Sequence, residues 1–446
     1  VMSDIKLTFW CVLPVCLISP AAHSFTLFDA WQAALEYSAD YSAAKYERDA
    51  EAAKKVLARA ELLPQTSANY QYQKQPYSLS SNTQSNGWNV QISQVLFDRS
   101  KFAQYKQGKL AEEMADIRLD NSGNELRIEV ANAYFDVLMY RDKLRAVRAE
   151  KEAYEKQVMR AQEMFRQGAA TVLDTHEAMS GYDNALAKEV DTLTRLKTSE
   201  STLANLTGLN PDEITVLNMK GGNEPVDLLD NSQEQEWQAL AQAHNPEWQL
   251  QRKNLENAQQ EVKAAKGTRM PTVTVNGGYT DSRGTYHYDY SAYGAGSFDQ
   301  DYRSKGATFN IQVSMPLFTG GKISGRIKEA ASREMQQREL LTAAERKTRL
   351  AVKQAYDTIR SNKIQITAQQ RLLESNRAKL EATRLGRQVG IRNNLEEIQA
   401  QQAASDAEQK LAEAKYGYIK AYLQLLQSAG VLGDENRIRR LSAALF

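Results

Sequence analysis

One turn in this chain of 446 residues has the composition of a phosphate-binding loop. The turn is Gly320-Gly321-Lys322, and it lies between a predicted strand and a predicted helix. Glycine-rich turns of this kind bind phosphate through backbone amides when further residues complete the motif. Those residues are missing, because Pro316 stands where the first glycine belongs and Ile323 stands where a serine or threonine binds magnesium. We therefore predict a tight strand-to-helix turn without a nucleotide.

The histidines and cysteines form no catalytic or metal-binding pattern. His176, His244 and His287 lie in separate predicted elements, and no two histidines have the His-x-x-x-His spacing of a zinc enzyme. Both cysteines, Cys11 and Cys16, lie in the N-terminal segment, so the remainder of the sequence has no thiol. No serine stands in the Gly-x-Ser-x-Gly turn of a hydrolase. We predict no catalytic residue, no metal site and no cofactor.

Charge and the N-terminal residues narrow the class of protein. The chain has 56 basic and 55 acidic residues, a balance that gives no strong field to attract nucleic acid. Lys6 precedes an apolar run over residues 7–18 and then small residues, which is the pattern of a secretory signal. We expect residues 1–24 to be a signal peptide cleaved after Ser24. Neither cysteine follows the small residues of a lipoprotein cleavage site, so we expect no lipid anchor.

The rest of the chain contains one structural unit twice, at an offset of about 222 residues. In the first unit Asp174 stands six residues after Gly168, and in the second unit Glu396 stands six residues after Gly390. Each glycine interrupts a long helical pattern, so each marks the turn of a helical hairpin. In both hairpins apolar residues recur every seven positions, which favours left-handed coiled coils. Self-similarity at a fixed offset indicates a duplicated unit.

The predicted domain organisation follows from this duplication. A helix over residues 322–385 would be on the order of 90–100 Å long, so it belongs to an elongated bundle. The predicted segments are a signal peptide, 1–24; repeat 1, 25–209, with a helix (27–63), two strands within 66–97 and a hairpin (99–206); a linker, 210–232; repeat 2, 233–430, with a helix (233–266), two strands within 272–318 and a hairpin (322–430); and a tail, 431–446.

The strand segments alternate apolar and polar residues. Val90 and Ile92, for example, alternate with Asn89 and Gln91. We expect four strands of roughly ten residues that face lipid on one side and water on the other. The loops that join them are expected near 78–87 and from after Asn276 to about Ser304. Four strands cannot close a barrel, so several subunits must form one barrel together. Three chains would leave a lumen inside the barrel, whereas two chains would leave little space beyond the side chains. The alternative is a pair of soluble hairpins packed on the helices.

The chain resembles the TolC family of outer-membrane exit ducts from about Leu27 to Leu441. The resemblance rests on the order of the elements, on the two glycine–acid turns, on Leu62-Leu63-Pro64 before the first strand and on Pro316-Leu317-Phe318 after the last. It implies a mainly α fold with a small β part: long coiled-coil hairpins and four membrane strands per chain. It also implies a homotrimer, closed into a twelve-stranded barrel above an α-helical tunnel.

The resemblance also implies a gate at the hairpin turns, which close the periplasmic end in this family. By position, Asp174 matches the gate aspartate, Arg392 the arginine of the second turn, and Glu396 the first of two acidic ring positions. The sequence departs at the second ring position, where Gln399 stands, and at Arg387, where an aromatic is usual. The candidate gate residues are thus Asp174, Arg387, Arg392, Glu396, Glu397 and Gln399, with Gly168 and Gly390 in the turns.

We expect a pair between Arg392 or Arg387 and an acid of the other hairpin, such as Asp174, to hold the tip shut. Because an exposed pair contributes about 0–1 kcal/mol, no single pair can act as the latch.

The implied function is the exit duct of a tripartite export system. Its partners would be a periplasmic adaptor (membrane fusion) protein, an inner-membrane ABC exporter or other pump, outer-membrane lipid and the cargo. Residues 31–35 and 47–50 look most similar to members that serve type I protein secretion. The alternative is the same duct serving multidrug or small-molecule efflux. An adaptor would have one hairpin and a β-rich docking domain, and an exported hydrolase would need the catalytic pattern that is missing. We expect the cell outer membrane of a Gram-negative cell, with the helices in the periplasm.

Overall fold

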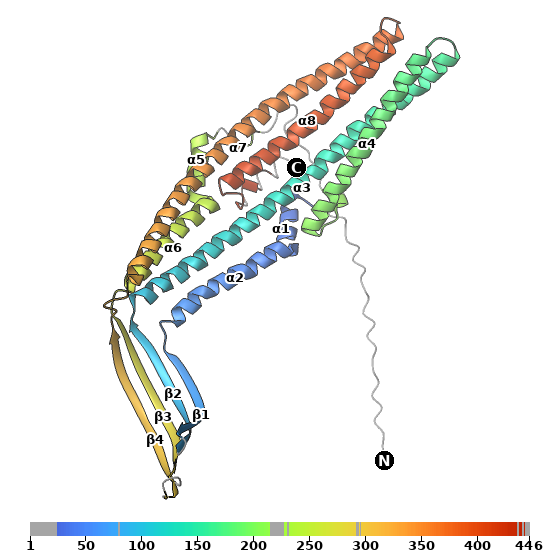
Figure 1. Cartoon of the computed structure of the whole chain (residues 1–446). Coiled ribbons are helices and arrows are strands. Elements are labelled where there is room, and N and C mark those ends of the chain that lie inside the picture. The colour runs from blue at the N-terminus through green and yellow to red at the C-terminus, as the bar shows by residue number, and fades with distance from the viewer. Residues whose placement is uncertain are drawn as a thin grey trace, which may run out of the picture.

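The computed structural model describes residues 25–78, 81–214, 227–229, 232–290, 294, 296–434, 437–438 and 441. The predicted signal peptide, 1–24, and most of the predicted linker lie outside the described residues. The described part is elongated, with long helices at one end and a curved sheet at the other (Figure 1). This mainly helical fold with a small antiparallel sheet confirms the predicted fold class.

The elements alternate between helices and strands in the predicted order. They are α1 (Leu27–Tyr37), α2 (Ala39–Ala60), β1 (Gln65–Ser78), β2 (Ser81–Phe97), α3 (Arg99–Arg166), α4 (Val172–Thr207), the 3-10 turn η1 (Pro211–Glu213), α5 (Glu234–His244), α6 (Pro246–Gly267), β3 (Thr272–Asp289), β4 (Ser297–Ser314), α7 (Lys322–Gln388) and α8 (Asn394–Ser428).

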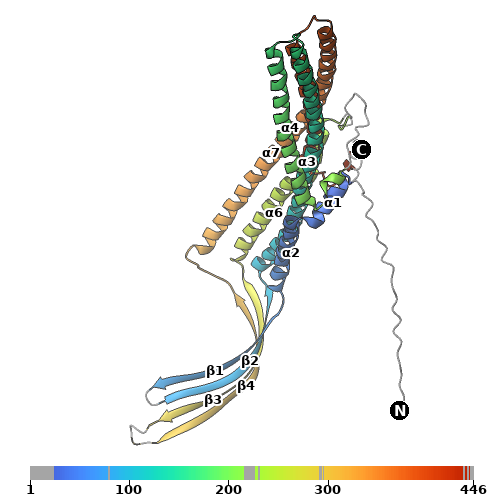
Figure 2. The same ribbon diagram turned by 90° about the vertical axis from the view of Figure 1, so that its right-hand side faces the viewer.

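Two long hairpins, α3–α4 and α7–α8, form the helical part, and α2 and α6 pack beside the halves of α3 and α7 that are nearer the sheet (Figures 1 and 2). The seven-residue apolar stripes lie where the sequence predicts, in the interior. The buried stripe positions are Val130, Val137 and Leu144 in α3, and Val352, Ile359, Ile366, Leu373 and Leu380 in α7. Their burial shows that the heptad spacing identified the packed seam. None of the described helices combines the length and low charge needed to cross a bilayer.

The helix before each pair of strands is interrupted, so the prediction of single helices over 27–63 and 233–266 is wrong. Ser38 is extended and its hydroxyl accepts a hydrogen bond from the Tyr41 amide at 3.2 Å, which starts α2. Asn245 does the same for the Trp248 amide at 3.0 Å, and Pro246 follows it. Serine and asparagine are strong helix N-caps, and their signal outweighs the high helix propensity of the surrounding residues.

The sheet has the order β1-β2-β3-β4, and every pair is antiparallel. The strands are 14, 17, 18 and 18 residues long, so the prediction of roughly ten residues is too short. Most of the predicted loops pair as strand instead, with Gln84 opposite Thr285 and Tyr286 opposite Gln300. Ladder hydrogen bonds come from the backbone, so pairing continues where the apolar alternation stops.

The register collects apolar side chains on one face of the sheet. Val275 lies opposite Ile311, and Val313 follows two positions along β4 on the same face. Phe309, Ile311 and Val313 are 72%, 60% and 66% exposed, so no described residue covers this part of the face. An uncovered apolar surface of this kind marks contact with lipid or another protein.

The opposite face of this part of the sheet is polar. It carries Gln, Asn, Ser and Thr from all four strands, and the Asn276 side-chain amide donates to Asn310 Oδ1 at 3.1 Å across β3 and β4. In the half nearer the helices, the sheet thus has one apolar face and one polar face, as the sequence alternation predicts.

Gly430 joins the end of α8 to the break between α5 and α6. Its φ is 73°, and a Cβ atom there would lie 2.3 Å from the His244 carbonyl oxygen. Nearby, the Asn245 side chain donates to the Ser428 carbonyl at 2.9 Å. The close approach of the two backbones requires glycine at this position.

Replacing Gly430 with alanine should therefore destabilise the helical part by at least about 1–2 kcal/mol, the cost of a left-handed residue with a Cβ atom. The measurement is thermal loss of helical circular dichroism in detergent. Gly417→Ala is the matched control, because its Cβ would meet only Asn362 Nδ2, at 3.9 Å. Equal melting temperatures for Gly430→Ala and wild type would contradict the packing described here.

Candidate functional site

The candidate gate residues lie in or beside the two turns that join α3 to α4 and α7 to α8. Figure 1 shows both turns at the end of the molecule farthest from the sheet. Both turns have the same backbone. Gly168 has φ 72° and Gly390 has φ 77°, and the amide of the following residue bonds back to the helix: Ala169 N to Met164 O, and Ile391 N to Gly386 O, each at 2.8 Å. This six-to-one closure needs a left-handed residue, which glycine supplies without strain.

Asp174 caps α4 from inside its first turn. Its Oδ2 accepts hydrogen bonds from the Thr171 hydroxyl at 2.7 Å and the Thr171 amide at 2.8 Å, while the Asp174 amide donates to the Thr171 hydroxyl at 3.3 Å. These bonds from Thr171 lower the pKa of the Asp174 carboxyl below its usual value. The aspartate is therefore ionised at neutral pH and already has a local structural role.

Glu396 occupies the corresponding position in the second turn, three residues after the cap Asn393. Asn393 Oδ1 accepts from the Glu396 amide at 2.8 Å. The Glu396 carboxylate pairs with Arg392 at 2.8 Å instead of reaching back to the cap. Both side chains are partly or fully exposed, so this pair contributes little on its own.

Glu397 is the buried charge of the tip. Its side chain is only 3% exposed, and Arg387 Nε lies 2.6 Å from its Oε2. Arg384 Nε lies 3.5 Å from the other oxygen, and its guanidinium also donates to Gln401 at 2.8 Å. The sequence comparison singled out Glu397 only as a neighbour of the missing second ring acid. Gln399, at that ring position, is exposed.

Within this single chain, neither arginine bridges the two hairpins, contrary to expectation. Arg392 and Arg387 pair inside the second hairpin, and Asp174 bonds to its own turn. The tips are joined through Asn394, whose side chain donates to the Asp174 backbone oxygen at 3.4 Å. Each of the two arginines lies closer to an acid of its own turn than to any acid of the other hairpin.

A second set of charged residues, which the sequence analysis missed, connects the hairpins farther down. Glu150 on α3 is 2% exposed and accepts from the Ser405 hydroxyl of α8 at 2.6 Å. Lys188 of α4 lies 3.4 Å from Glu150 and 3.2 Å from Asp406 of α8. Burial alone lowers the pKa of Lys188, but the two carboxylates outweigh it and raise the pKa, so this lysine stays charged.

The spacing of α3 contains a signal for this network. Val147, Glu150, Tyr154, Gln157 and Ala161 are separated by three and four residues in turn, which is seam spacing, and all five are buried. Polar residues in a seam are unusual, because a buried polar group needs a partner. Tyr154 has one, since its hydroxyl donates to the Ile398 carbonyl at 3.2 Å.

The described residues contain no group of three His, Cys, Asp or Glu side chains arranged to hold a metal ion. His176 lies in α4, His244 at the end of α5 and His287 in β3. Gly320 and Gly321 have φ values of 59° and 85° and form a tight turn into α7.

The chain combines two helical hairpins with a sheet that has one polar face and one uncovered apolar face. This is the architecture of a channel subunit. Residues 30–209 and 237–431 match the family described as outer membrane efflux protein, and the chain belongs to this family. This membership confirms the predicted family and the predicted outer-membrane location.

Relatives with known names cover nearly the whole chain. The proteases secretion protein PrtF of Dickeya chrysanthemi is 26% identical over 94% of this chain and 91% of its own length. The alkaline protease secretion protein AprF of Pseudomonas aeruginosa is 28% identical over 94% and 87%. The outer membrane protein TolC of Vibrio cholerae is 27% identical over 94% of each.

Solved structures share the fold. The Campylobacter jejuni CmeC outer membrane channel has a TM-score of 0.76 at 14% identity, over 94% of this chain and 90% of its own. The outer membrane protein VceC of Vibrio cholerae has a TM-score of 0.75 at 15% identity, over 91% and 96%. At these identities the likeness concerns the fold alone.

The capping bonds of Asp174 predict a local effect of Thr171→Val. Losing the cap should weaken the first turn of α4 by about 1 kcal/mol and speed amide hydrogen exchange there about fivefold. Mass spectrometry of deuterium uptake measures this. Thr175→Val is the control, since it leaves the cap intact.

The same hydrogen bonds predict a pH dependence. Because the pKa of Asp174 is lowered in the folded chain, its contribution to stability is complete above the ordinary aspartate pKa and is lost as the pH falls through the lowered value. A wild-type advantage that persists in strong acid would argue against this role.

Proposed function

We propose that three copies of this chain form a passive exit duct in the outer membrane, through which an inner-membrane pump exports protein. The observation that carries the proposal is the sheet: its apolar face is uncovered, and β1 and β4 are open edges. In lipid, every unpaired backbone group costs several kcal/mol, so the edges must pair with other copies. Three copies bring twelve strands, enough for a water-filled lumen, whereas two would bring eight and leave little space.

The duct has two repeats per chain, residues 25–209 and 233–430, joined by the linker 210–232. The identical turns at Gly168 and Gly390 support this division. With the helices in the periplasm, the hairpin tips point toward the inner membrane. They are the natural contact for a periplasmic adaptor and an ABC exporter or other pump, which supply the energy that this chain lacks.

Protein is the cargo that the relatives favour. Two of them, PrtF and AprF, are named for secretion of proteases, and their similarity spans nearly the whole chain. The second candidate is efflux of small molecules, supported by the description of the family as efflux proteins and by the outer membrane efflux protein BepC of Brucella suis, 23% identical over 84% of this chain.

Deleting the gene should abolish release of at least one large secreted protein into the medium, and a plasmid copy should restore it. The measurement is the protein content of culture supernatants, alongside accumulation of a fluorescent dye in the same cells. Normal secretion with increased dye retention would favour the efflux function.

The gate would lie at the tips. Three copies of Glu396, with Asp174 nearby, would form a ring of like charges that attracts cations. Arg392, exposed beside Glu396, and Arg387, paired with the buried Glu397, would hold the second turn in place, and Gln399 would reduce the charge of the ring. Since exposed pairs are weak, the closed state depends on the threefold set together with seam packing.

In planar bilayers, Glu396→Gln combined with Asp174→Asn should weaken cation selectivity and block by multivalent cations. Arg387→Ser should raise the resting conductance more than Arg392→Ser, because only the former leaves a buried carboxylate without its nearest partner. Arg349→Ser is the control, as Arg349 forms the same kind of pair with Glu345, at 2.9 Å, in the body of α7. Unchanged selectivity and conductance in all tip variants would reduce these residues to ordinary helix-end charges.

A further inference from the structure

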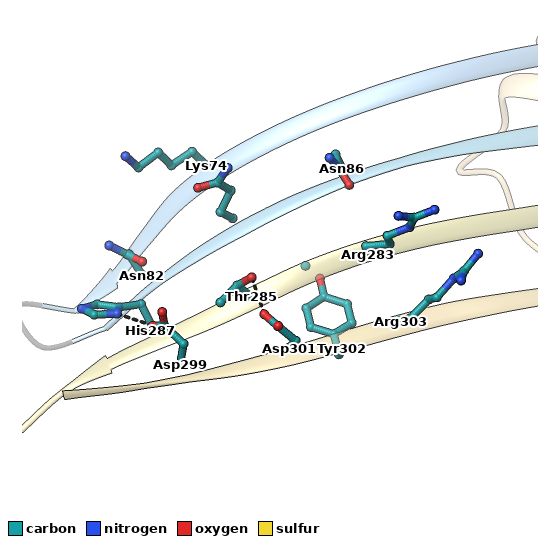
Figure 3. A pocket seen from close by; sticks show the side chains of 12 residues that line it. Lys74, Asn82, Asn86, Arg283, Thr285, His287, Asp299, Asp301, Tyr302 and Arg303 are labelled. Atoms are coloured by element: carbon teal, nitrogen blue, oxygen red, sulfur yellow. Dashed lines mark hydrogen bonds and ion pairs between the residues drawn. The ribbon is translucent and has the colours of Figure 1, made fainter.

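A polar hollow of about 840 Å³ lies on the outer half of the sheet (Figure 3). Side chains from all four strands line it. Most of them lie on the same face of the sheet as the apolar residues described above, but farther from the helices. Its charged lining residues are Lys74, Arg283, Arg303, His287, Asp299 and Asp301.

The face changes character at one level of the register. Trp88 lies opposite Asp281, and Asp281 lies opposite Lys305. On the helix side of this row the face is apolar, and the Trp88 and Tyr279 rings stack there with centroids 5.4 Å apart. Aromatic rings at the edge of an apolar band are typical of the membrane–water interface. The hollow begins where this band ends, at the depth of lipid headgroups.

The acids of the region already have partners. Asp281 accepts two hydrogen bonds from the Arg303 guanidinium, at 2.7 and 3.0 Å. Asp299 contacts His287, and Asp301 accepts from the Thr285 hydroxyl at 2.7 Å. These contacts are drawn in part in Figure 3, where Arg283 and Lys74 stand apart from them.

Two cations are left over. Among the described residues, Arg283 and Lys74 form no hydrogen bond or close ion pair, although both line the hollow, and Arg283 interacts with Asp281 only at longer range. Arg283 also lies directly opposite Arg303 in the register, and like charges at such positions repel. Because Asp281 already offsets the charge of Arg303, an anion at this position would mainly balance the charge of Arg283.

The reverse face holds the backbone of the hollow in place. Tyr286 stacks on Tyr302 with centroids 5.0 Å apart, and Tyr288 stacks on Phe298 at 4.9 Å. Tyr302 lies so close to Gly284 that a Cβ atom there would be 2.6 Å from its ring. These cross-strand pairs extend the β3–β4 hairpin past the apolar band and give the polar side chains a fixed support.

We infer that this hollow binds a phosphate-bearing headgroup of an outer-leaflet lipid, with Arg283 and Lys74 as its cationic ligands. The inference rests on the proposed function, because it requires the apolar band to face lipid. Guanidinium groups suit phosphate, since their donors match its oxygens in pairs. Asn82, Gln84 and Asn86, side by side along β2, supply further amide donors for sugar or phosphate oxygens.

The test uses the purified full-length channel in phosphatidylcholine nanodiscs, with lipid A, dephosphorylated lipid A or inorganic diphosphate added. Native mass spectrometry should show lipid A bound about tenfold more than its dephosphorylated form, and Lys74→Gln with Arg283→Gln should abolish that difference. Arg346→Gln with Lys347→Gln, two exposed cations of α7, should leave it intact.

Three outcomes would overturn the inference: lipid A retained by the Lys74 and Arg283 variant, loss of lipid A in the α7 control, or diphosphate bound as tightly as lipid A, which would indicate a site for soluble anions. Conductance of the same preparations separates this inference from the proposed function. A wild-type channel that conducts but does not prefer lipid A contradicts only the lipid site, whereas a wild-type chain that forms no channel contradicts the function itself.

Discussion

The backbone of an open sheet edge requires hydrogen-bond partners, and this requirement governs the rest of the molecule. β1 and β4 each expose one row of amides and carbonyls, and the apolar face between them is uncovered. In water such edges invite aggregation, and in lipid they are costly. A single chain has no means to satisfy them, so the sheet is complete only as part of an assembly.

The helical part is held together by its seams. Its seams are apolar in the middle of the long helices and become polar toward the tips, where Glu150, Gln157 and Glu397 are buried. Glu150 has a hydrogen-bonded partner in Ser405, and a buried charge of this kind contributes less stability than apolar packing would. The tip end of the bundle therefore has the weaker and more directional contacts, while its middle is packed with Tyr134, Ile359 and Leu426.

Much of this arrangement could be predicted from the sequence, because repetition and periodicity report directly on packing. The heptad positions of α7, the alternation in β3 and β4 and the glycines of both turns all lie where their patterns indicated. The breaks at Ser38 and Asn245 were missed because a cap is one residue within a strongly helical composition. The strand ends were missed because their polar residues, such as Gln84 and Thr285, resemble those of loops. Which acid pairs with which arginine depends on side-chain geometry, although seam spacing places Glu397, and not Glu396, in register with the buried Ala400, Ala404 and Ala407.

The position of β2 and β3 as neighbours in the middle of the sheet affects how the chain reaches its native state. Ser93 pairs with Asn276, so the whole first hairpin and the linker separate the two central strands in sequence. The helical hairpins close through contacts near in sequence and can form early, whereas the central strand pairing has high contact order and must be late. Until then β1 and β2 form an isolated two-stranded hairpin, which is marginal in water. We therefore expect the newly exported chain to pass through a stage with finished helices and an unfinished sheet, at which aggregation competes with insertion.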